Sequence, residues 1–418
     1  MQTLLSLRSA QLLLLISLLI AGLVVGVSII PISRIAELGF ALQSSWPQQQ
    51  WQIPTATLLL GLLAWGPLSK GRGGGVTGLL AMQEKDLGEL NQDRALHSLA
   101  LAAQLQRLAL LALTHLGGLA VGIESPSASM GASVALALTR VLPTLKQIPP
   151  ALLGCIGGGA GLAAAFHAPL LGVAYAFEEL SRLKGLSLVL PTMLMAASAS
   201  MIKINLGRPA HGHEQLSRVD WASIGSSFYL VPLAAMLGVL FIWALVKMAQ
   251  IMQAFFHKRT MAAAISCALV LYGLAVWSRG ASLNDGQLLL SASLIANQQS
   301  PPMWLILPRF ISSLVSISMG APGGLMHDAM TLGALLGASS GSTVAALAAA
   351  SFFAAAQGTP LFCALFVLQL SINPELTGPL LAASAFGCWI SEWLGLQRWN
   401  HWQVDAFMKR TKLSCPDS

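Results

Sequence analysis

The chain has 418 residues, of which 55% are hydrophobic and only 9% are charged, and its mean hydropathy is +0.70. Soluble domains carry about a quarter charged residues, so this composition excludes a soluble globular protein and predicts an all-α polytopic membrane protein. The 23 Lys and Arg exceed the 16 Asp and Glu; in a membrane protein such an excess is typical of basic cytoplasmic loops, and we expect no nucleic-acid partner.

The first part of the chain alternates long apolar segments with glycine and proline breaks. The first apolar run, Leu12–Ile30, is too long for a signal-peptide core, so we expect a retained helix. A second segment near Thr55–Leu68 ends in a basic, glycine-rich break, and a charged surface stretch over Glu84–Arg94 follows. The next segment, Leu96–Leu142, is interrupted at Gly117–Gly122.

One carboxylate, Glu124, directly follows that interruption. Between Asp93 and Glu178 the chain contains no other acidic residue. A carboxylate inside a membrane is costly unless it faces a partner, water or an ion. A broken helix is tolerated there only where its backbone groups line a cavity or are buried in protein, and its exposed N-terminus attracts anions. These features predict an anion pathway with an acidic gate; a Glu that caps the helix break is the alternative.

The remaining segments follow the same pattern. Leu152–Leu180 is broken at His167-Ala168-Pro169, and Gly185–Leu206 leads to a polar loop over Arg208–Asp220 that we expect outside the cell. Ile224–Phe256 stops at the basic run His257-Lys258-Arg259, a signal for the cytoplasmic side.

The last third contains four further apolar segments and a second glycine break at Gly320–Gly324. The apolar segments are Met261–Trp277, Leu305–Met319, Leu332–Phe366 and Gly378–Leu394. An aromatic and basic tail follows, and with Arg8 it places both termini in the cytoplasm. Many segments are shorter than a spanning helix, which predicts tilted and re-entrant helices. The five cysteines have no metal-site spacing, so we expect buried small hydrophobic residues and no metal or other cofactor.

The two halves of the chain resemble each other. The sequence around His167-Ala168-Pro169 is similar to Gly358-Thr359-Pro360, and Gly122-Ile123-Glu124 is similar to Gly324-Leu325-Met326, in the same order. Paired broken segments indicate a binding site where two repeats meet at the midplane. We therefore expect a single transmembrane domain, 1–418, made of a first half over 1–220 and a second half over 221–418.

These motifs resemble those of the CLC family of chloride channels and chloride/proton antiporters. Gly122-Ile123-Glu124-Ser125-Pro126 is similar to the family's G-R-E-G-P motif, Gly158–Glu179 to its longest recognisable run, and Gly320–Asp328 to its G-A-P-G-G-I-F-A-P segment. The resemblance implies a CLC-type inverted-repeat fold, a homodimer with one anion pathway per subunit, and no regulatory domain after the membrane part.

The resemblance also implies roles for particular residues. Glu124 takes the place of the gating glutamate, and Glu179 that of the internal proton acceptor. The implied anion-binding positions are Gly74, Gly75, Ile123, Ser125, Leu325, Met326, His327 and Trp402. The sequence departs from the family pattern at several of these positions. Gly73–Thr77 stands where the family has its serine motif, Ile123 replaces the arginine of the G-R-E-G-P motif, and Trp402 replaces a tyrosine.

Other polar residues also lie in apolar segments. Asp328 has no family counterpart and either caps the helix that starts there or is neutralised by His327. Arg309 is a candidate counter-ion for an intramembrane acid. His115 and His167 are expected to be satisfied core histidines. Of the adjacent acids, we expect Glu179 to face the interior and Glu178 to meet the surface near Arg182.

The sequence as a whole predicts a proton-coupled antiporter of small inorganic anions, chloride first among them, in the bacterial inner membrane. A passive voltage- or pH-gated chloride channel, a fluoride/proton antiporter and a transport-impaired homologue are the alternatives. The second acid, Glu179, favours exchange, because a passive channel needs no internal proton site. An intramembrane hydrolase that uses Ser125 with His115 or His167 lacks the sequence arrangement of a nucleophile site, so we do not expect an enzyme.

Overall fold

The computed structural model describes residues 2–44, 50–84, 89–206, 223–295, 300–395 and 398–414. Within these ranges the chain is built of α-helices, as predicted, with short 3-10 and π turns between them. The predicted outer loop over Arg208–Asp220 lies outside the described residues.

The helices of the first half are α1 (Gln2–Ser44), α2 (Gln52–Ala64), α3 (Thr77–Ala81), α4 (Glu89–Ser98), α5 (Leu101–Leu116), α6 (Glu124–Leu138), α7 (Pro150–Phe166), α8 (Pro169–Tyr175) and α9 (Leu186–Leu206). Those of the second half are α10 (Ser227–Trp277), α11 (Gln287–Leu294), α12 (Ile306–Ser318), α13 (Met326–Gly337), α14 (Ser342–Gln357), α15 (Pro360–Ser371), α16 (Thr377–Trp393) and α17 (Trp399–Ser414).

Helix lengths agree with the predicted mixture of spanning and shorter segments. Within the described residues, Gln11–Ala41 and Ile224–Trp277 are long and apolar enough to cross a membrane. The second stretch is divided at Arg259, whose φ of −148° and ψ of 66° break the helix at the predicted basic run. Other apolar helices, among them α2, α7, α14 and α15, have only 10 to 17 residues, so they cross the bilayer incompletely or at breaks.

The break in each half has the same local geometry. Helix α7 ends at His167 in the left-handed region (φ 53°), and α8 begins two residues later with Pro169. Helix α14 likewise ends at Gly358 (φ 82°), and α15 begins with Pro360. A left-handed residue ends a helix and proline starts the next one well. The structure thus confirms both breaks; the division of the chain at residue 220 stays a prediction.

Small side chains explain the centre of the fold. Nearly every residue of α7 and α14 is buried; α7 is rich in Ala and Gly, and α14 is rich in Ala. Because apolar surface gains little from leaving lipid, membrane helices associate through close packing, which small residues permit. Helix α7 packs against α6, and α14 against α13. These pairs hold the N-termini of α6 and α13 in place.

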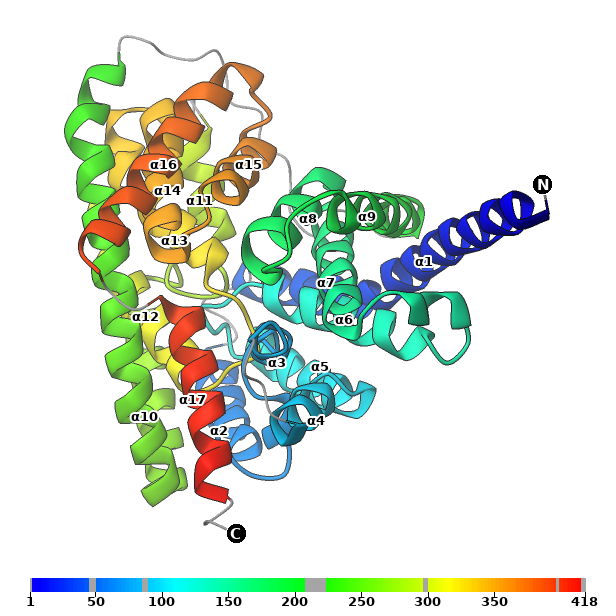
Figure 1. Ribbon diagram of the computed structural model, residues 1–418. Coiled ribbons are helices and arrows are strands. Elements are labelled where there is room, and N and C mark those ends of the chain that lie inside the picture. Colours follow the sequence, from blue (N-terminus) through cyan, green and yellow to red (C-terminus); the bar gives the residue numbers. More distant parts are fainter. Residues whose placement is uncertain are drawn as a thin grey trace.

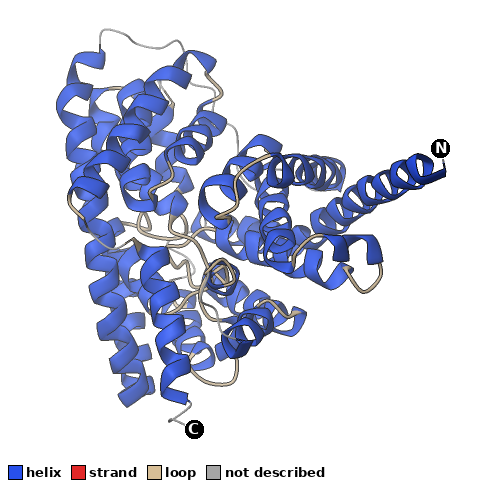
Figure 2. Cartoon of the chain, in the orientation of Figure 1, coloured by secondary structure: helices blue, strands red, loops and turns tan. Residues whose placement is uncertain are grey.

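The irregular backbone lies in the middle of the molecule rather than only at its ends, as Figure 2 shows. Helix α1 runs out to one side and α10 lies along the other, so that the breaks before α6 and α13 are enclosed between them (Figure 1). Helix α17 extends from this middle region alongside α10 and packs against α3. The segment predicted as a tail is therefore a docked helix.

Candidate functional site

The interruptions of the two halves are joined by backbone hydrogen bonds. The N–H of Gly122 donates to the carbonyl of Gly324 (3.0 Å), and the N–H of Gly324 donates to the carbonyl of Gly122 (2.8 Å). A third segment joins them where the N–H of Gly73 donates to the carbonyl of Gly320 (3.0 Å). Backbone groups freed by the helix breaks are thereby satisfied inside the protein, as membrane depth requires.

Glu124 lies at this junction, at the start of α6, and its side chain is completely buried. Its Oε1 accepts a hydrogen bond from the backbone N–H of His327 (3.1 Å) at the start of α13 and also contacts Nδ1 of the His327 ring. The carboxylate therefore occupies the N-terminus of a helix from the other half, which is the place that the backbone would otherwise offer to an anion.

Two glycines make room for this carboxylate. A Cβ atom on Gly122 would lie 2.2 Å from Oε2 of Glu124, and one on Gly324 would lie 2.6 Å from the same atom. Both distances are far below van der Waals contact. The space that Glu124 fills therefore depends on the absence of a side chain at both positions.

A small cavity of about 40 Å³ adjoins the junction. Its lining includes Gly74, Ser125, Leu325 and Met326, four of the predicted anion-binding residues. This volume is sufficient for a water molecule or a small anion. Glu124 itself lies beyond it, next to Ser125.

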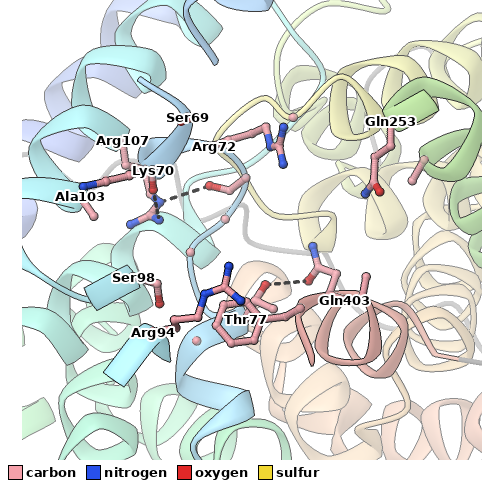
Figure 3. A pocket seen from close by; sticks show the side chains of 18 of the residues that line it. Ser69, Lys70, Arg72, Thr77, Arg94, Ser98, Ala103, Arg107, Gln253 and Gln403 are labelled. Carbon is pink, nitrogen blue, oxygen red and sulfur yellow. Dashed lines mark hydrogen bonds between the residues drawn. The ribbon is translucent and has the colours of Figure 1, made fainter. Parts of the chain in front are cut away.

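A second, much larger cavity of about 610 Å³ leads to the small one, and both are lined by Gly73, Gly74, Trp399 and Gln403. Figure 3 shows its polar side chains, which include the basic residues Lys70, Arg72, Arg94 and Arg107. No acidic residue is among the described residues that line it. A concave, positively charged surface of this kind raises the local concentration of anions.

Arg107 fixes the loop that separates the two cavities. Its guanidinium donates to the carbonyl of Gly73 (3.2 Å), to Gln104 Oε1 (2.6 Å) and to Ser129 Oγ (3.1 Å). Ser129 Oγ in turn donates to the carbonyl of Gly75 (3.1 Å). The side chain of Arg107 is almost completely buried, so its charge is shared among backbone and amide oxygens and holds the glycine loop in shape.

The two adjacent acids of the first half point to different neighbours. They lie in a single π-helical turn, Ala176–Leu180. Glu178 accepts hydrogen bonds from the backbone N–H groups of Leu361 (3.2 Å) and Phe362 (2.7 Å), at the start of α15. Glu179 contacts the side-chain amide of Asn400 on α17. Arg182, near which Glu178 was expected to meet the surface, forms an ion pair with Glu84.

Asp328 and Arg309 form a buried ion pair between α13 and α12, and neither side chain is exposed. Arg309 also donates to the carbonyl of Leu283 (2.8 Å). The prediction that Arg309 is the counter-ion of an intramembrane acid is confirmed. The proposed neutralisation of Asp328 by His327 was wrong, since His327 turns to Glu124 instead.

The structure places the remaining predicted residues as follows. Gly75 and Trp402 line the larger cavity only, Ile123 is buried directly before α6, and His327 lines neither cavity. His115 is buried as expected, but its Nε2 has no hydrogen-bond partner among the described residues. Ser125 lines the small cavity, and neither His115 nor His167 is among the residues that line it.

Several residues at the site were not predicted. Tyr175, Gln357, Trp399, Asn400 and Gln403 line the small cavity. Arg94, expected on the surface, lines the large one. Arg107 carried the same signal as Glu124, a lone charge in an apolar segment, and could have been found by it. Asn400 could not, because it meets Glu179 across 221 residues of sequence.

The sequence model of a family described as voltage gated chloride channel matches residues 67–392, which is most of the chain. This protein belongs to that family. The match includes every break and both acids, Glu124 and Glu179. The family consists of membrane transporters and channels, in agreement with the apolar helices.

The named relatives of this chain are similar to it at low sequence identity. The H⁺/Cl⁻ exchange transporter ClcA of Vibrio cholerae is 24% identical over 335 residues, which cover 72% of this chain and 69% of that protein. ClcA of Yersinia pestis is 23% identical over 299 residues, covering 66% and 63% of the two chains.

Two solved structures share the fold. A slow cyanobacterial Cl⁻/H⁺ antiporter superposes with a TM-score of 0.76 at 20% identity, and the match covers 96% of this chain and 98% of that one. A CLC-type fluoride/proton antiporter superposes with a TM-score of 0.72 at 22% identity, covering 91% and 94%. The predicted CLC-type fold is thus confirmed.

Proposed function

We propose that this CLC protein exchanges small inorganic anions for protons across a membrane. The observation that carries the proposal is the position of Glu124, whose carboxylate occupies a helix N-terminus that would otherwise bind an anion. Ionised, Glu124 competes with the anion; protonated, it leaves the position and carries a proton. One side chain thereby couples the two movements.

A second acid supports exchange over passive conduction. Glu179 lies on a different element and contacts Asn400, a residue of the small cavity. A proton that leaves Glu124 toward the small cavity can therefore reach the carboxylate of Glu179 by way of the Asn400 side of that cavity. A channel that only conducts anions has no need of this residue, and the named relatives in Vibrio and Yersinia are exchangers.

Chloride is the proposed anion, and fluoride is the second candidate. The small cavity of about 40 Å³ admits either ion. Fluoride is retained because one structure with the same fold is a fluoride/proton antiporter, and because the loop Gly73–Gly75 supplies no hydroxyl group where the family serine is expected. We propose no cofactor besides the transported ions.

The assembly and location are also proposals. We expect a homodimer with one pathway in each subunit, in a bacterial inner membrane and with both termini cytoplasmic. The relatives that carry a species name are bacterial, and the exposed basic run at the kink of α10 supports a cytoplasmic position for that kink.

Flux through liposomes tests the proposal. An outward chloride gradient is expected to drive protons uphill in the unmutated protein. Glu179→Ala is expected to abolish proton movement while part of the anion flux remains, and Glu124→Ala to leave anion flux that no longer depends on pH. Chloride flux without protons in the unmutated protein would identify a channel, and no flux of chloride, fluoride or nitrate would identify a transport-impaired homologue.

A further inference from the structure

The carboxylate of Glu124 belongs to a larger group of buried charges. We name as the buried charge cluster Glu124, Asp285, Arg309, His327 and Asp328, all of which are at most 2% exposed. They come from four places in the fold: α6, the turn before α11, α12 and α13. Of these five side chains, the proposed function uses only that of Glu124.

The contact between His327 and Glu124 requires a proton. Nδ1 of the ring is in hydrogen-bond contact with Oε1 of the carboxylate. Two lone pairs would repel each other in such a contact. Either the ring donates to the carboxylate, or the protonated carboxyl donates to the ring. Whichever atom holds it, one exchangeable proton lies between the two side chains when Glu124 is in this position.

The ring of His327 is held in a fixed orientation for this contact. Phe166 stacks on it with ring centroids 5.5 Å apart, and Phe366 meets it edge to face at 5.4 Å. The main chain is fixed as well, because Thr331 donates to the carbonyl of His327 (2.8 Å). The imidazole is therefore held in one orientation, in which Nδ1 faces Glu124.

The charges of the cluster do not balance unless it holds protons. It contains three carboxyl groups and one guanidinium, so with a neutral imidazole the negative charges exceed the positive by two. Arg309 is already engaged by Asp328, and Asp285 accepts from the backbone N–H of Gln287 (3.1 Å). Uncompensated charge is very unfavourable inside a membrane protein. The cluster therefore retains protons, and His327 lies within electrostatic range of its three acids.

Resting on the proposed exchange, we propose that His327 is a second proton carrier, which delivers protons to Glu124 and receives them from it. In the loading step the bond between the proton and Nδ1 breaks and a bond between that proton and Oε1 forms. The imidazolium and carboxylate become a neutral imidazole and a neutral carboxyl. The imidazole keeps its proton at Nε2 and, once Glu124 has left, takes up one proton at Nδ1. In the unloading step a protonated Glu124 meets a neutral imidazole, the bond between the proton and Oε1 breaks and a bond between that proton and Nδ1 forms.

Other titratable groups near Glu124 are not placed to exchange a proton directly with its carboxylate. His115 on α5 and Tyr175 on α8 lie within electrostatic range of its carboxylate. In the described residues neither is hydrogen-bonded to it. Asp328 is paired with Arg309, which leaves the imidazole as the group in contact.

The test uses His327→Asn in the full chain, reconstituted in liposomes. The asparagine amide can donate to Glu124 as Nδ1 does but cannot take up and release a proton. We expect proton-coupled exchange to slow at least tenfold, in line with the loss of a positioned acid–base group, and its pH profile to lose one titration step. In a Glu124→Ala background the same substitution is expected to slow anion flux by a much smaller factor than it slows exchange, because no carboxyl remains to receive a proton.

Controls separate this role from others. His257→Gln, at the exposed kink of α10, is expected to behave as the unmutated protein. His327→Gln serves as a second variant if His327→Asn does not fold. An unchanged rate and pH profile would overturn the proposal, and so would an equal loss of anion flux with and without Glu124, which would make His327 an anion ligand. If the unmutated protein moves anions without protons, the proposed function fails first, and that result is visible before any His327 variant is made.

Discussion

Arg309 and Asp328 are buried completely between α12 and α13, where neither charge reaches water. A buried pair adds little stability compared with apolar side chains of the same size, yet the loss of one partner leaves the other uncompensated. The two residues therefore behave as a unit. Their stability effects are expected to be strongly non-additive.

Asp328→Asn or Arg309→Met alone is expected to lower the stability of the folded protein by about 3–5 kcal/mol. The combination Arg309→Met with Asp328→Leu is expected to recover most of that loss. Thermal unfolding in detergent, followed by size-exclusion chromatography, measures the effect. Single variants that unfold at the temperature of the unmutated protein would show that the pair is not isolated from water.

Partner choice within this cluster was only partly predictable. A lone Arg in an apolar helix predicts an acidic partner nearby, so Arg309 was correctly expected to act as a counter-ion. Adjacent residues such as His327 and Asp328 point about 100° apart on a helix. Which of them meets Arg309 and which meets Glu124 depends on how α13 is rotated against α6 and α12, and that rotation is set by packing across the whole molecule.

Among the structural elements, the two glycine breaks matter most, because they bring helix N-termini from both halves to one place. Their positions followed from local sequence, since glycine and proline interrupt a helix wherever they occur in these patterns. The reciprocal hydrogen bonds between Gly122 and Gly324 did not, because pairing between segments 202 residues apart leaves no local trace.

Gly324→Ala is expected to reduce proton-coupled exchange at least tenfold. Its Cβ would lie 2.6 Å from Oε2 of Glu124 and would expel the carboxylate from its place. Gly378→Ala on α16 is the matched control, because a Cβ there meets no atom within 4 Å. The comparison is read from flux at several pH values. Equal activity of the two variants would mean that Glu124 does not need the space that Gly324 leaves.

Across the whole molecule, a basic cavity of about 610 Å³ adjoins one of about 40 Å³, and the buried Glu124 directly precedes Ser125, which lines the smaller one. Composition was sufficient to predict the helical membrane fold. Composition could not predict that α17 lines both cavities through Trp399 and Gln403, because a short, polar helical segment carries no signal of where it docks. Trp402, which was predicted to bind the anion, lines the larger cavity and not the small one.

The central claim is that the carboxylate of Glu124 takes the place of an anion at the junction of the two halves. A structure of the Glu124→Ala variant in bromide, with anomalous scattering to locate the ion, tests it most directly. We expect a bromide ion at the position that the Glu124 carboxylate occupies in the unmutated protein, within hydrogen-bond distance of the backbone N–H of His327. Bromide in the cavities but absent from that position would contradict it.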